Sequence, residues 1–292
     1  MMTKSTKGKI SYQGEAGANS HIACLEAAPD YEPLACHTFE DAFQAVKDGS
    51  AALAMIPIDN SVAGRVADIH HLMPQSNLAI IGEYFLPVHH QLLIIKGADT
   101  SAITTVHSHV HALGQCRKEI RARGLKAVVA VDTAGAAREL SEVKDPTRAV
   151  IASRLAADIY GLDTWAKDIE DESHNTTRFV VLSPDRQDTP SSTQDVVTSF
   201  VFRVRNVPAA LYKAMGGFAT NGVNMTKLES YQLEGQFSAT QFYADIEGHP
   251  DDANVRLALE ELAFFTSYTR ILGVYPASPY RAELAAKRAA LG

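Results

Sequence analysis

The chain has 292 residues, of which 46% are hydrophobic, and a formal net charge of -7 at pH 7. A chain of this length is usually too long to fold around a single hydrophobic core, so we expect two or three compact units. The acidic balance argues against a general binder of nucleic acids or of anionic membranes, because both need a basic face. If the protein binds an anionic ligand, a local group of hydrogen-bond donors must hold it, because the net charge of the chain does not attract anions.

The cysteines predict neither a disulfide framework nor a zinc site. Cys24, Cys36 and Cys116 are odd in number and lack paired metal-ligand spacing. Residues 1–9 contain no apolar run typical of a signal peptide, and no later run is long enough to span a bilayer. We therefore expect a cytoplasmic protein without a membrane partner.

Short β-forming runs alternate with helical patterns along the first half of the chain. The pattern predicts strands at 10–12, 34–37 and 52–58, each followed by a helix, at 16–28, 39–47 and 64–73. After an apolar run that ends at 95, it predicts strands at 127–131 and 149–153, followed by helices at 133–140 and 155–160. This alternation is typical of βαβ units with mainly parallel sheets, and we interpret it as two α/β lobes.

Two segments are expected to cross between the lobes, one at 84–90 and one at 165–175 that returns the chain to the first lobe. A cleft beside such a hinge is a usual ligand site. The polar, Pro-containing segment 185–194 is typical of a linker. After it, the predicted order of elements is strand, helix, two strands, helix and strand, which is the ferredoxin-like βαββαβ plan, and a helical tail at 280–291 follows.

The most informative motif is Asn175-Thr176-Thr177-Arg178-Phe179, which places two hydroxyls and a guanidinium before an apolar strand. Such a set can bind an anion and donate a proton, although threonine is also common in strands for packing reasons. Polar residues from Asp59 to Ser61 follow another apolar strand, at the edge where open α/β sheets bind ligands. They could also cap the next predicted helix.

Two further motifs leave alternatives open. Gly14–His21 follows a strand and opens a helix, so it is either an anion-binding loop or a tight turn capped by Asn19 or Ser20. The histidines His107, His109 and His111 suggest a metal site, but helical periodicity from 110 to 121 makes Ser108 an N-cap and separates the rings. We expect no metal there.

In chain order, the motifs are Gly14–His21, Ile56–Ser61, Ser108-His109 with Gln115-Cys116, Ala152-Ser153 with Tyr160-Gly161-Leu162, and Asn175–Phe179. In this set of motifs, which follow one another in the family's order, the chain resembles the prephenate dehydratase family. The resemblance implies a periplasmic-binding-protein-like (type 2) catalytic domain at 1–185, with one lobe at 8–86 and 170–185 and the other at 87–169. It also implies a linker at 186–196, an ACT regulatory domain at 197–277 and a tail at 278–292. The implied reaction is decarboxylative dehydration of prephenate to phenylpyruvate in L-phenylalanine biosynthesis, with no metal or organic cofactor.

The resemblance also implies roles for individual residues. Thr177 would donate to the leaving hydroxyl, with proton transfer late in the step because a threonine hydroxyl is a weak acid. The implied catalytic residues are Thr177, Asn60, Ser108 and Gln115, and the implied substrate-binding residues are Ser61, Thr176, Arg178, Ser20 and Phe179. The chain departs from the family pattern at Asp59, where Glu is common, and at Val110-His111, which replaces Pro-Gln.

In the predicted ACT domain, Pro208-Ala209-Ala210-Leu211 and Glu229-Ser230-Tyr231-Gln232 resemble phenylalanine-binding motifs in degraded form. The implied effector is L-phenylalanine, held by Pro208, Ala209, Ala210, Leu211, Asn224, Glu229 and Ser230. Such domains usually pair, so we expect a homodimer or a homotetramer. Three alternatives are arogenate dehydratase, a non-catalytic small-molecule sensor, and a metal-dependent hydrolase that uses the three histidines.

Overall fold

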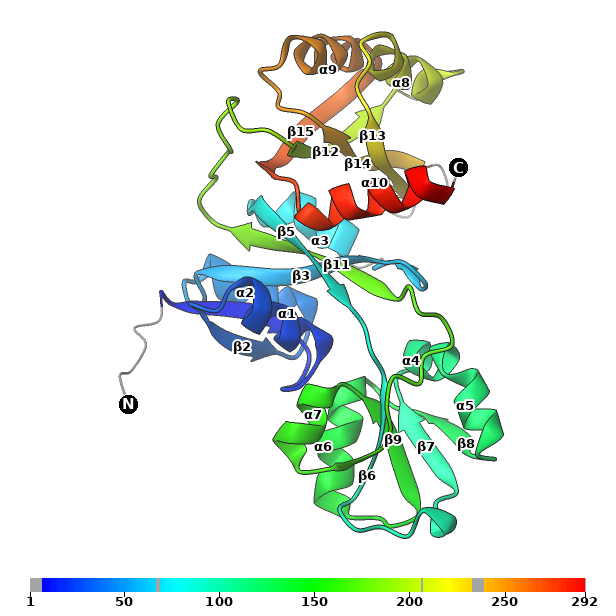
Figure 1. Ribbon diagram of the computed structural model, residues 1–292. Coiled ribbons are helices and arrows are strands. Elements are labelled where there is room, and N and C mark those ends of the chain that lie inside the picture. Colours follow the sequence, from blue (N-terminus) through cyan, green and yellow to red (C-terminus); the bar gives the residue numbers. More distant parts are fainter. Residues whose placement is uncertain (1–6, 67–68, 206, 233–238, 292) are drawn as a thin grey trace. The chain divides into compact units, whose positions relative to one another are not determined.

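The computed structural model describes residues 7–66, 69–205, 207–232 and 239–291, and Figure 1 gives the order of their elements. Contacts divide the chain into two units, one made of residues 1–66 and 84–179 and the other of residues 67–83 and 180–292. No helix among the described residues combines the length and the apolar character needed to cross a membrane.

The first sheet has the strand order β2-β1-β3-β11-β5, with β4 paired to β3. β1 runs parallel to both β2 and β3. β11 and β5 each have residues in both units. The strands are β1 (Lys9–Gln13), β2 (Glu32–Cys36), β3 (Leu53–Asn60), β4 (Gly64–Arg65), β5 (Ala79–Pro87) and β11 (Thr176–Ser183), and the helices between them are α1 (Asn19–Ala27), α2 (Phe39–Lys47) and α3 (Ile69–Ser76).

The second sheet has the strand order β10-β6-β9-β7-β8 and lies in the first unit. β7 runs parallel to β8 and β9, whereas β6 runs antiparallel to β9 and β10. Its strands are β6 (Gln91–Ile94), β7 (Thr105–Ser108), β8 (Lys126–Val129), β9 (Arg148–Ala152) and β10 (Asp163–Ala166), and its helices are α4 (Val110–Gln115), α5 (Arg117–Ala122), α6 (Thr133–Val143), α7 (Arg154–Tyr160) and the 3-10 turn η1 (Thr100–Ala102).

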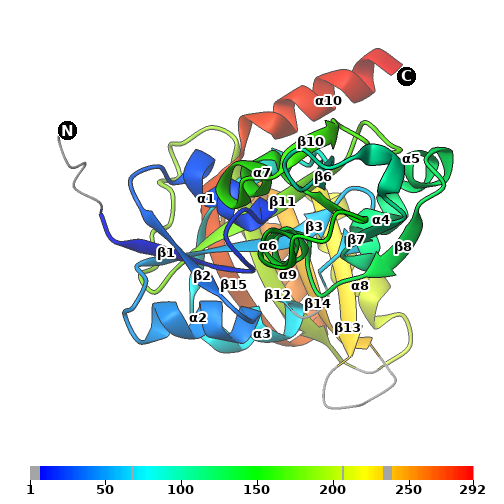
Figure 2. The ribbon, with the colours of Figure 1, turned by 90° about the horizontal axis from the view of Figure 1, so that it is seen from below.

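Both faces of this second sheet are buried, since alternate residues of a strand point to opposite faces. Leu92 and Ile151 join a core with α4 and α5, whereas Leu93 and Val150 join a separate core with α6 and α7. Figure 2 shows these two pairs of helices in different places around the strands. This double cover confirms the expected α/β class.

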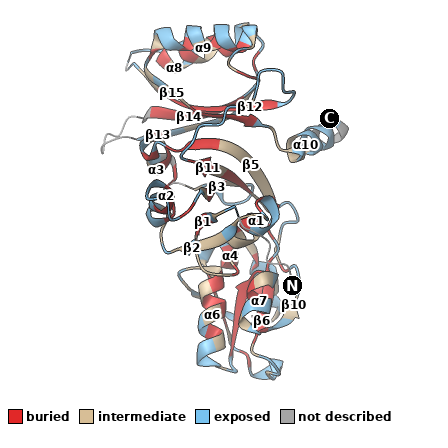
Figure 3. Cartoon of the chain, turned by 90° about the vertical axis from the view of Figure 1, so that its left-hand side faces the viewer, coloured by how far each residue is buried: buried red, intermediate tan, exposed pale blue. Residues whose placement is uncertain are grey.

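The second unit contains a four-stranded antiparallel sheet in the order β13-β14-β12-β15. Its strands are β12 (Val196–Val204), β13 (Met225–Gln232), β14 (Ala239–Glu247) and β15 (Thr266–Pro276), and its helices are α8 (Ala210–Thr220), α9 (Ala253–Phe265) and the tail α10 (Pro279–Leu291). This order confirms the ferredoxin-like plan. Figure 3 shows α8 and α9 with buried faces beside buried strands, and Phe200 and Phe202 supply part of that core.

Several predicted elements are wrong. Residues 64–73 do not form one helix, because the Asn60 side-chain oxygen accepts from the backbone N–H groups of Val62 and Ala63 and closes a turn into β4. Asp59 and Ser61 therefore do not cap a helix there. Strands β5, β7 and β10 were not predicted. The two middle strands of the ferredoxin-like plan were predicted at 225–233 and 236–246, and residues 233 and 236–238 lie outside the described residues.

The predicted caps are also wrong. Ser108 ends β7, and His109 caps α4 by accepting from the backbone N–H of His111. The predicted helix 110–121 is broken at Cys116, which separates α4 from α5. At α1 the N-cap residue is Ala18, with no side-chain cap, rather than Asn19 or Ser20.

Candidate active site

The end of β3 and the start of β11 place Asn60 against Thr177. The Asn60 Nδ2 donates to the Thr177 Oγ1 at 2.9 Å. The orientation of the Asn60 amide is fixed, because its Oδ1 already accepts from two backbone N–H groups of the following turn, at 3.0 and 2.7 Å. The Thr177 oxygen is thus an acceptor of this bond, and among the described residues no acceptor takes its own proton. That proton can be donated to a bound molecule.

A line of amides continues from Asn60 toward the second lobe. The Asn60 Nδ2 also donates to the Asn175 Oδ1 at 2.8 Å, and the Asn175 Nδ2 donates to the Gln115 Oε1 at 3.0 Å. The His90 Nε2 lies 2.7 Å from the same Gln115 oxygen. Asn175 and His90 are buried, each only 4% exposed. These hydrogen bonds therefore link β3, β11 and α4 with the first inter-lobe crossing, residues 84–90.

The polar segment before β11 is held to Ser61. The Ser61 Oγ donates to the His174 carbonyl at 2.6 Å and accepts from the Thr176 backbone N–H at 2.9 Å. The Ser61 N–H donates to the Thr176 carbonyl at 2.9 Å. These hydrogen bonds fix the backbone beside Thr177. They join Ser61, which is exposed, to Thr176, so these two of the predicted substrate-binding residues lie next to each other.

Arg178 lies apart from the Thr177 hydroxyl, because neighbouring residues of a strand point to opposite sides. Its side chain is 6% exposed, with an Nη1 3.9 Å from the Asp59 Oδ2 and its guanidinium 5.9 Å from the centre of the Phe85 ring. Phe179 is buried in the core at 1% exposure. Phe179 thus supplies core, and the Arg178 guanidinium lies beside Asp59 and Phe85.

Two other predicted residues lie outside the hydrogen-bonded set around Thr177. Ser108 is fully buried at the end of β7, and its hydroxyl donates to the Ile151 carbonyl at 2.6 Å. Ser20 lies in the first turn of α1 and is 8% exposed. The proposed substrate roles of Ser108 and Ser20 thus have no support from contacts with Thr177.

A pocket lies beside the amides. The side-chain NH₂ of Gln115 has no partner among the residues described, so it remains available to a ligand, while the Gln115 oxygen is held by Asn175 and His90. Sequence reasoning did not assign Asn175 or His90 to the site. Asn175 is the first residue of the motif Asn175–Phe179, so the sequence could have pointed to it. His90 has no feature in the sequence that marks it, apart from its place in the first predicted crossing, 84–90. The pocket is lined by Val62, Gly114, Gln115, Arg117, Glu170, Asp171, Glu172 and Asn175.

The glycine loop after β1 contacts the second lobe. The Ser153 Oγ donates to the Gly17 carbonyl at 2.5 Å, and the Tyr160 hydroxyl donates to the Ala16 carbonyl at 2.9 Å. The Gly17 backbone has φ +89°, and its N–H donates to the His21 Nδ1 at 3.0 Å. This N–H is therefore already paired, and the contacts favour a loop that joins the lobes.

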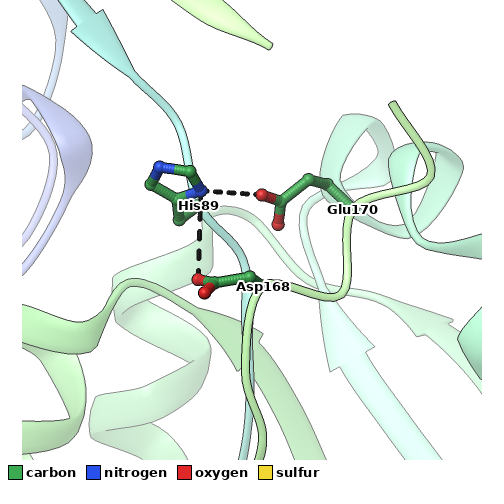
Figure 4. Close-up of side chains that lie close together, drawn as sticks. All are labelled: His89, Asp168 and Glu170. Atoms are coloured by element: carbon green, nitrogen blue, oxygen red, sulfur yellow. Dashed lines mark hydrogen bonds and ion pairs between the residues drawn. The ribbon is translucent and has the colours of Figure 1, made fainter. Parts of the chain in front are cut away.

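Three side-chain atoms that could act as metal ligands lie close together where the two inter-lobe crossings run side by side. They belong to His89, Asp168 and Glu170, as Figure 4 shows. The His89 Nδ1 is 2.7 Å from the Glu170 Oε1 and 3.9 Å from the Asp168 Oδ1. The other Glu170 oxygen accepts from the His90 N–H at 2.9 Å. Ordinary hydrogen bonds thus account for this cluster, which joins the crossings.

His107, His109 and His111, the histidines of the alternative metal-dependent hydrolase, do not form such a cluster. Among the described residues, His89 with Asp168 and Glu170 is the one group with three metal-type donor atoms within 4.8 Å. His109 and His111 have ring centres 5.0 Å apart, and the His109 Nδ1 accepts from a backbone N–H.

The predicted effector residues lie at two places in the second unit. Pro208 and Ala209 are exposed before α8, and Ala209 is its N-cap residue, with a left-handed φ of 61°. Ala210 is buried and Leu211 is partly buried in the first turn of α8. Asn224, which precedes the edge strand β13, donates to Glu247 at 2.9 Å. Glu229 and Ser230 lie on β13, where Lys227 is 3.3 Å from Glu229.

Comparison with known proteins agrees with this geometry. Residues 10–187 match the family described as "PDT: Prephenate dehydratase". The chain is 48% identical over 272 residues to a "Bifunctional N-acyl-homoserine lactone acylase/prephenate dehydratase" of Komagataeibacter europaeus, which covers 93% of this chain and 97% of the relative. It is 37% identical to "Arogenate dehydratase/prephenate dehydratase 1, chloroplastic" of Arabidopsis thaliana, covering 93% of this chain and 72% of the relative.

A solved structure supports the same conclusion. Prephenate dehydratase from Arthrobacter aurescens, solved in complex with L-Phe, has a TM-score of 0.83 and 30% identity to this chain. The match covers 97% of this chain and 98% of the other. The chain therefore belongs to the prephenate dehydratase family, and it is a hydro-lyase.

Proposed function

We propose that the protein converts prephenate to phenylpyruvate, water and carbon dioxide. The bond between the ring and its carboxylate breaks, and its electron pair enters the ring as the ring hydroxyl leaves. The leaving oxygen takes up one proton and becomes water. Because aromatisation drives the reaction, the site must mainly orient the substrate and supply a proton donor.

The observation that carries the proposal is the bond from Asn60 to Thr177. Since the amide occupies a lone pair of the hydroxyl oxygen, the O–H can be directed at the leaving group. A threonine hydroxyl is a weak acid, so we expect a hydrogen bond early in the step and proton transfer late in it. The NH₂ of Gln115 supports a second contact, to a substrate carboxylate.

The test is phenylpyruvate formation from prephenate at neutral pH in chelator, where we expect turnover without added metal. Thr177→Ser keeps the hydroxyl and is the matched control for Thr177→Ala. The proposal is supported if the serine variant keeps most of the turnover that the alanine variant loses. Equal turnover by Thr177→Ala and the natural protein would exclude Thr177 as the donor.

Arogenate is the alternative substrate, because the name of the relative from Arabidopsis thaliana includes arogenate dehydratase. The chemistry at the ring is the same, so the two substrates differ only at the side chain that carries a keto or an amino group. The ratio of kcat/KM for prephenate to that for arogenate decides between them. Turnover of neither substrate would favour the sensor hypothesis.

The name of the relative from Komagataeibacter europaeus also includes an acylase. The identity of 48% is the reason to test this activity, which would need a nucleophile. Release of homoserine lactone from an N-acyl-homoserine lactone should be measured on the same preparations. If Thr177→Ala abolishes dehydration and leaves acyl release unchanged, the two activities use different residues.

We also propose that residues 197–277 form an ACT domain that binds L-phenylalanine and inhibits the enzyme. The related structure in complex with L-Phe supports this choice of effector. Ala209 has φ 61°, a conformation that glycine adopts without strain, and its methyl stands where the family pattern has glycine. Ala209→Gly is therefore expected to lower the phenylalanine concentration for half-inhibition, with activity in its absence unchanged. An unchanged or higher half-inhibition concentration would contradict this role.

The assembly that we propose is a homodimer or a homotetramer. The proposal rests on the resemblance to ACT domains, which usually pair, and on β13 as an end strand in the sheet order of the described residues. Sedimentation with and without phenylalanine tests it, and a monomer under both conditions would remove the proposal.

A further inference from the structure

The imidazole of His90 lies next to the proposed active site but has no part in the proposed chemistry. It is 4% exposed, on the first crossing between the lobes. Burial lowers its pKa, so the ring is neutral at pH 7. A neutral imidazole has one N–H donor and one acceptor nitrogen, and the tautomer follows from its partners.

The partner of His90 determines that tautomer. Its Nε2 is 2.7 Å from the Gln115 Oε1, and a carbonyl oxygen only accepts, so Nε2 carries the proton. The backbone of His90 is held on both sides, since its N–H donates to the Glu170 Oε2 at 2.9 Å and its carbonyl accepts from the Ile169 N–H at 2.9 Å. The ring is thus a fixed donor.

This donor and the Asn175 amide together hold the Gln115 side chain in one orientation. The Gln115 Oε1 accepts from both His90 and Asn175, so its NH₂ must point elsewhere. Without the imidazole, one hydrogen bond from Asn175 would remain to hold the amide. A rotated amide would present its oxygen, and not its NH₂, to a substrate carboxylate. Both groups only accept hydrogen bonds, and the partial negative charge of the amide oxygen would be repelled by the carboxylate.

We propose that His90 is a positioning residue, which fixes the Gln115 amide so that its NH₂ faces a carboxylate of the substrate. This inference rests on the proposed dehydratase function. The role is distinct from that of Thr177, because the Asn60 amide beside Thr177 is oriented by backbone N–H groups and not by His90.

The test is a double-mutant cycle of His90→Phe and Gln115→Ala, with kcat and KM for prephenate measured for each variant. Phenylalanine keeps the ring and removes the donor. We expect His90→Phe to lower kcat/KM about 10- to 100-fold, with a large share of the loss in KM. Because His90 acts through Gln115, the double variant should be no slower than Gln115→Ala alone.

Two variants keep the test specific. His90→Gln places an amide donor near the former Nε2 and should recover part of the loss. His89→Gln is the matched control on the same segment, because the His89 side chain is exposed and bonded to Glu170 instead of Gln115. A merely structural role of His90 would instead make the two losses multiply in the double variant, which would overturn the proposal.

A measurement without substrate separates this proposal from the proposed function. The ¹⁵N shifts of the His90 ring report which nitrogen carries the proton. A proton on Nε2 supports the positioning role, and a proton on Nδ1 alone overturns it even in an active enzyme. Absence of turnover by the natural protein would overturn the proposed function, and the ring proton would still decide the contact with Gln115.

Discussion

Gly17→Ala should weaken the contact between the glycine loop and α7. The Gly17 backbone has φ +89°, and an added Cβ would lie 2.7 Å from the Ala156 Cα and 3.0 Å from its backbone nitrogen. Backbone atoms of a helix cannot move aside as a flexible side chain can. The loop must therefore shift away from α7, and the hydrogen bonds from Ser153 and Tyr160 would be lost with the contact.

The magnitude follows from two contributions. The left-handed backbone costs an alanine about 1 kcal/mol, and each of the two lost hydrogen bonds contributes about 1 kcal/mol. Gly17→Ala should thus lower the free energy of unfolding by about 3 kcal/mol. Gly49→Ala is the matched control, because Gly49 has φ +80° and an added Cβ would meet nothing within 4 Å. It should cost about 1 kcal/mol.

The assay is urea unfolding, followed by circular dichroism and by the fluorescence of the single tryptophan, Trp165. The KM for prephenate should rise in Gly17→Ala and stay unchanged in Gly49→Ala, since the first contact joins the two lobes. If both variants lost the same stability and kept the same KM, the contact with α7 would contribute nothing and the reasoning would be refuted.

Three other measurements test further parts of the structure. Thr177→Ala should lower kcat about 10²- to 10⁴-fold, by steady-state assay, with little change in thermal stability. Arg281→Met should cost about 3 kcal/mol in urea unfolding, because it removes the Arg281 guanidinium from the Glu83 carboxylate, which is 0% exposed. Arg256→Met, at an exposed ion pair, should cost about 0.5 kcal/mol. Burial raises the pKa of the Cys24 thiol to about 12, compared with about 8.5 in an unfolded chain. The free energy of unfolding should therefore fall as pH rises from about 8.5 toward 12, because the unfolded chain loses the proton first. The variant Cys24→Ala should lack this part of the pH dependence.

The periodicity of the sequence predicted the α/β lobes and the ferredoxin-like plan well, since buried strands and amphipathic helices leave local patterns. The predicted helix at 64–73 was wrong because of local turn chemistry. Residues 64–73 have apolar spacing suited to a helix, but the Asn60 side chain and Gly64, at φ +83°, favour a tight turn. The predicted Ser108 cap was wrong by one residue, because β7 continues through Ser108.

The site was only partly predictable for a different reason. Asn60 and Thr177 each follow or open an apolar strand, which the sequence displays. Their direct bond joins residues on neighbouring strands, and the bond from His90 to Gln115 depends on how the first crossing passes α4. Arg178 was predicted to bind substrate, and this stays a prediction; its place beside Asp59 depends on strand pairing, which the sequence does not display.

The position of β11 has a consequence for synthesis of the chain on the ribosome. β11 lies between β3 and β5 in the first sheet, although it is made long after both. At roughly 5–20 residues per second, β5 waits on the order of 10 s for its neighbour. The strands of the second sheet are all complete before β11 emerges. The lobe that begins later can therefore finish folding earlier, and a nascent chain stopped before β11 would expose the unpaired sides of β3 and β5.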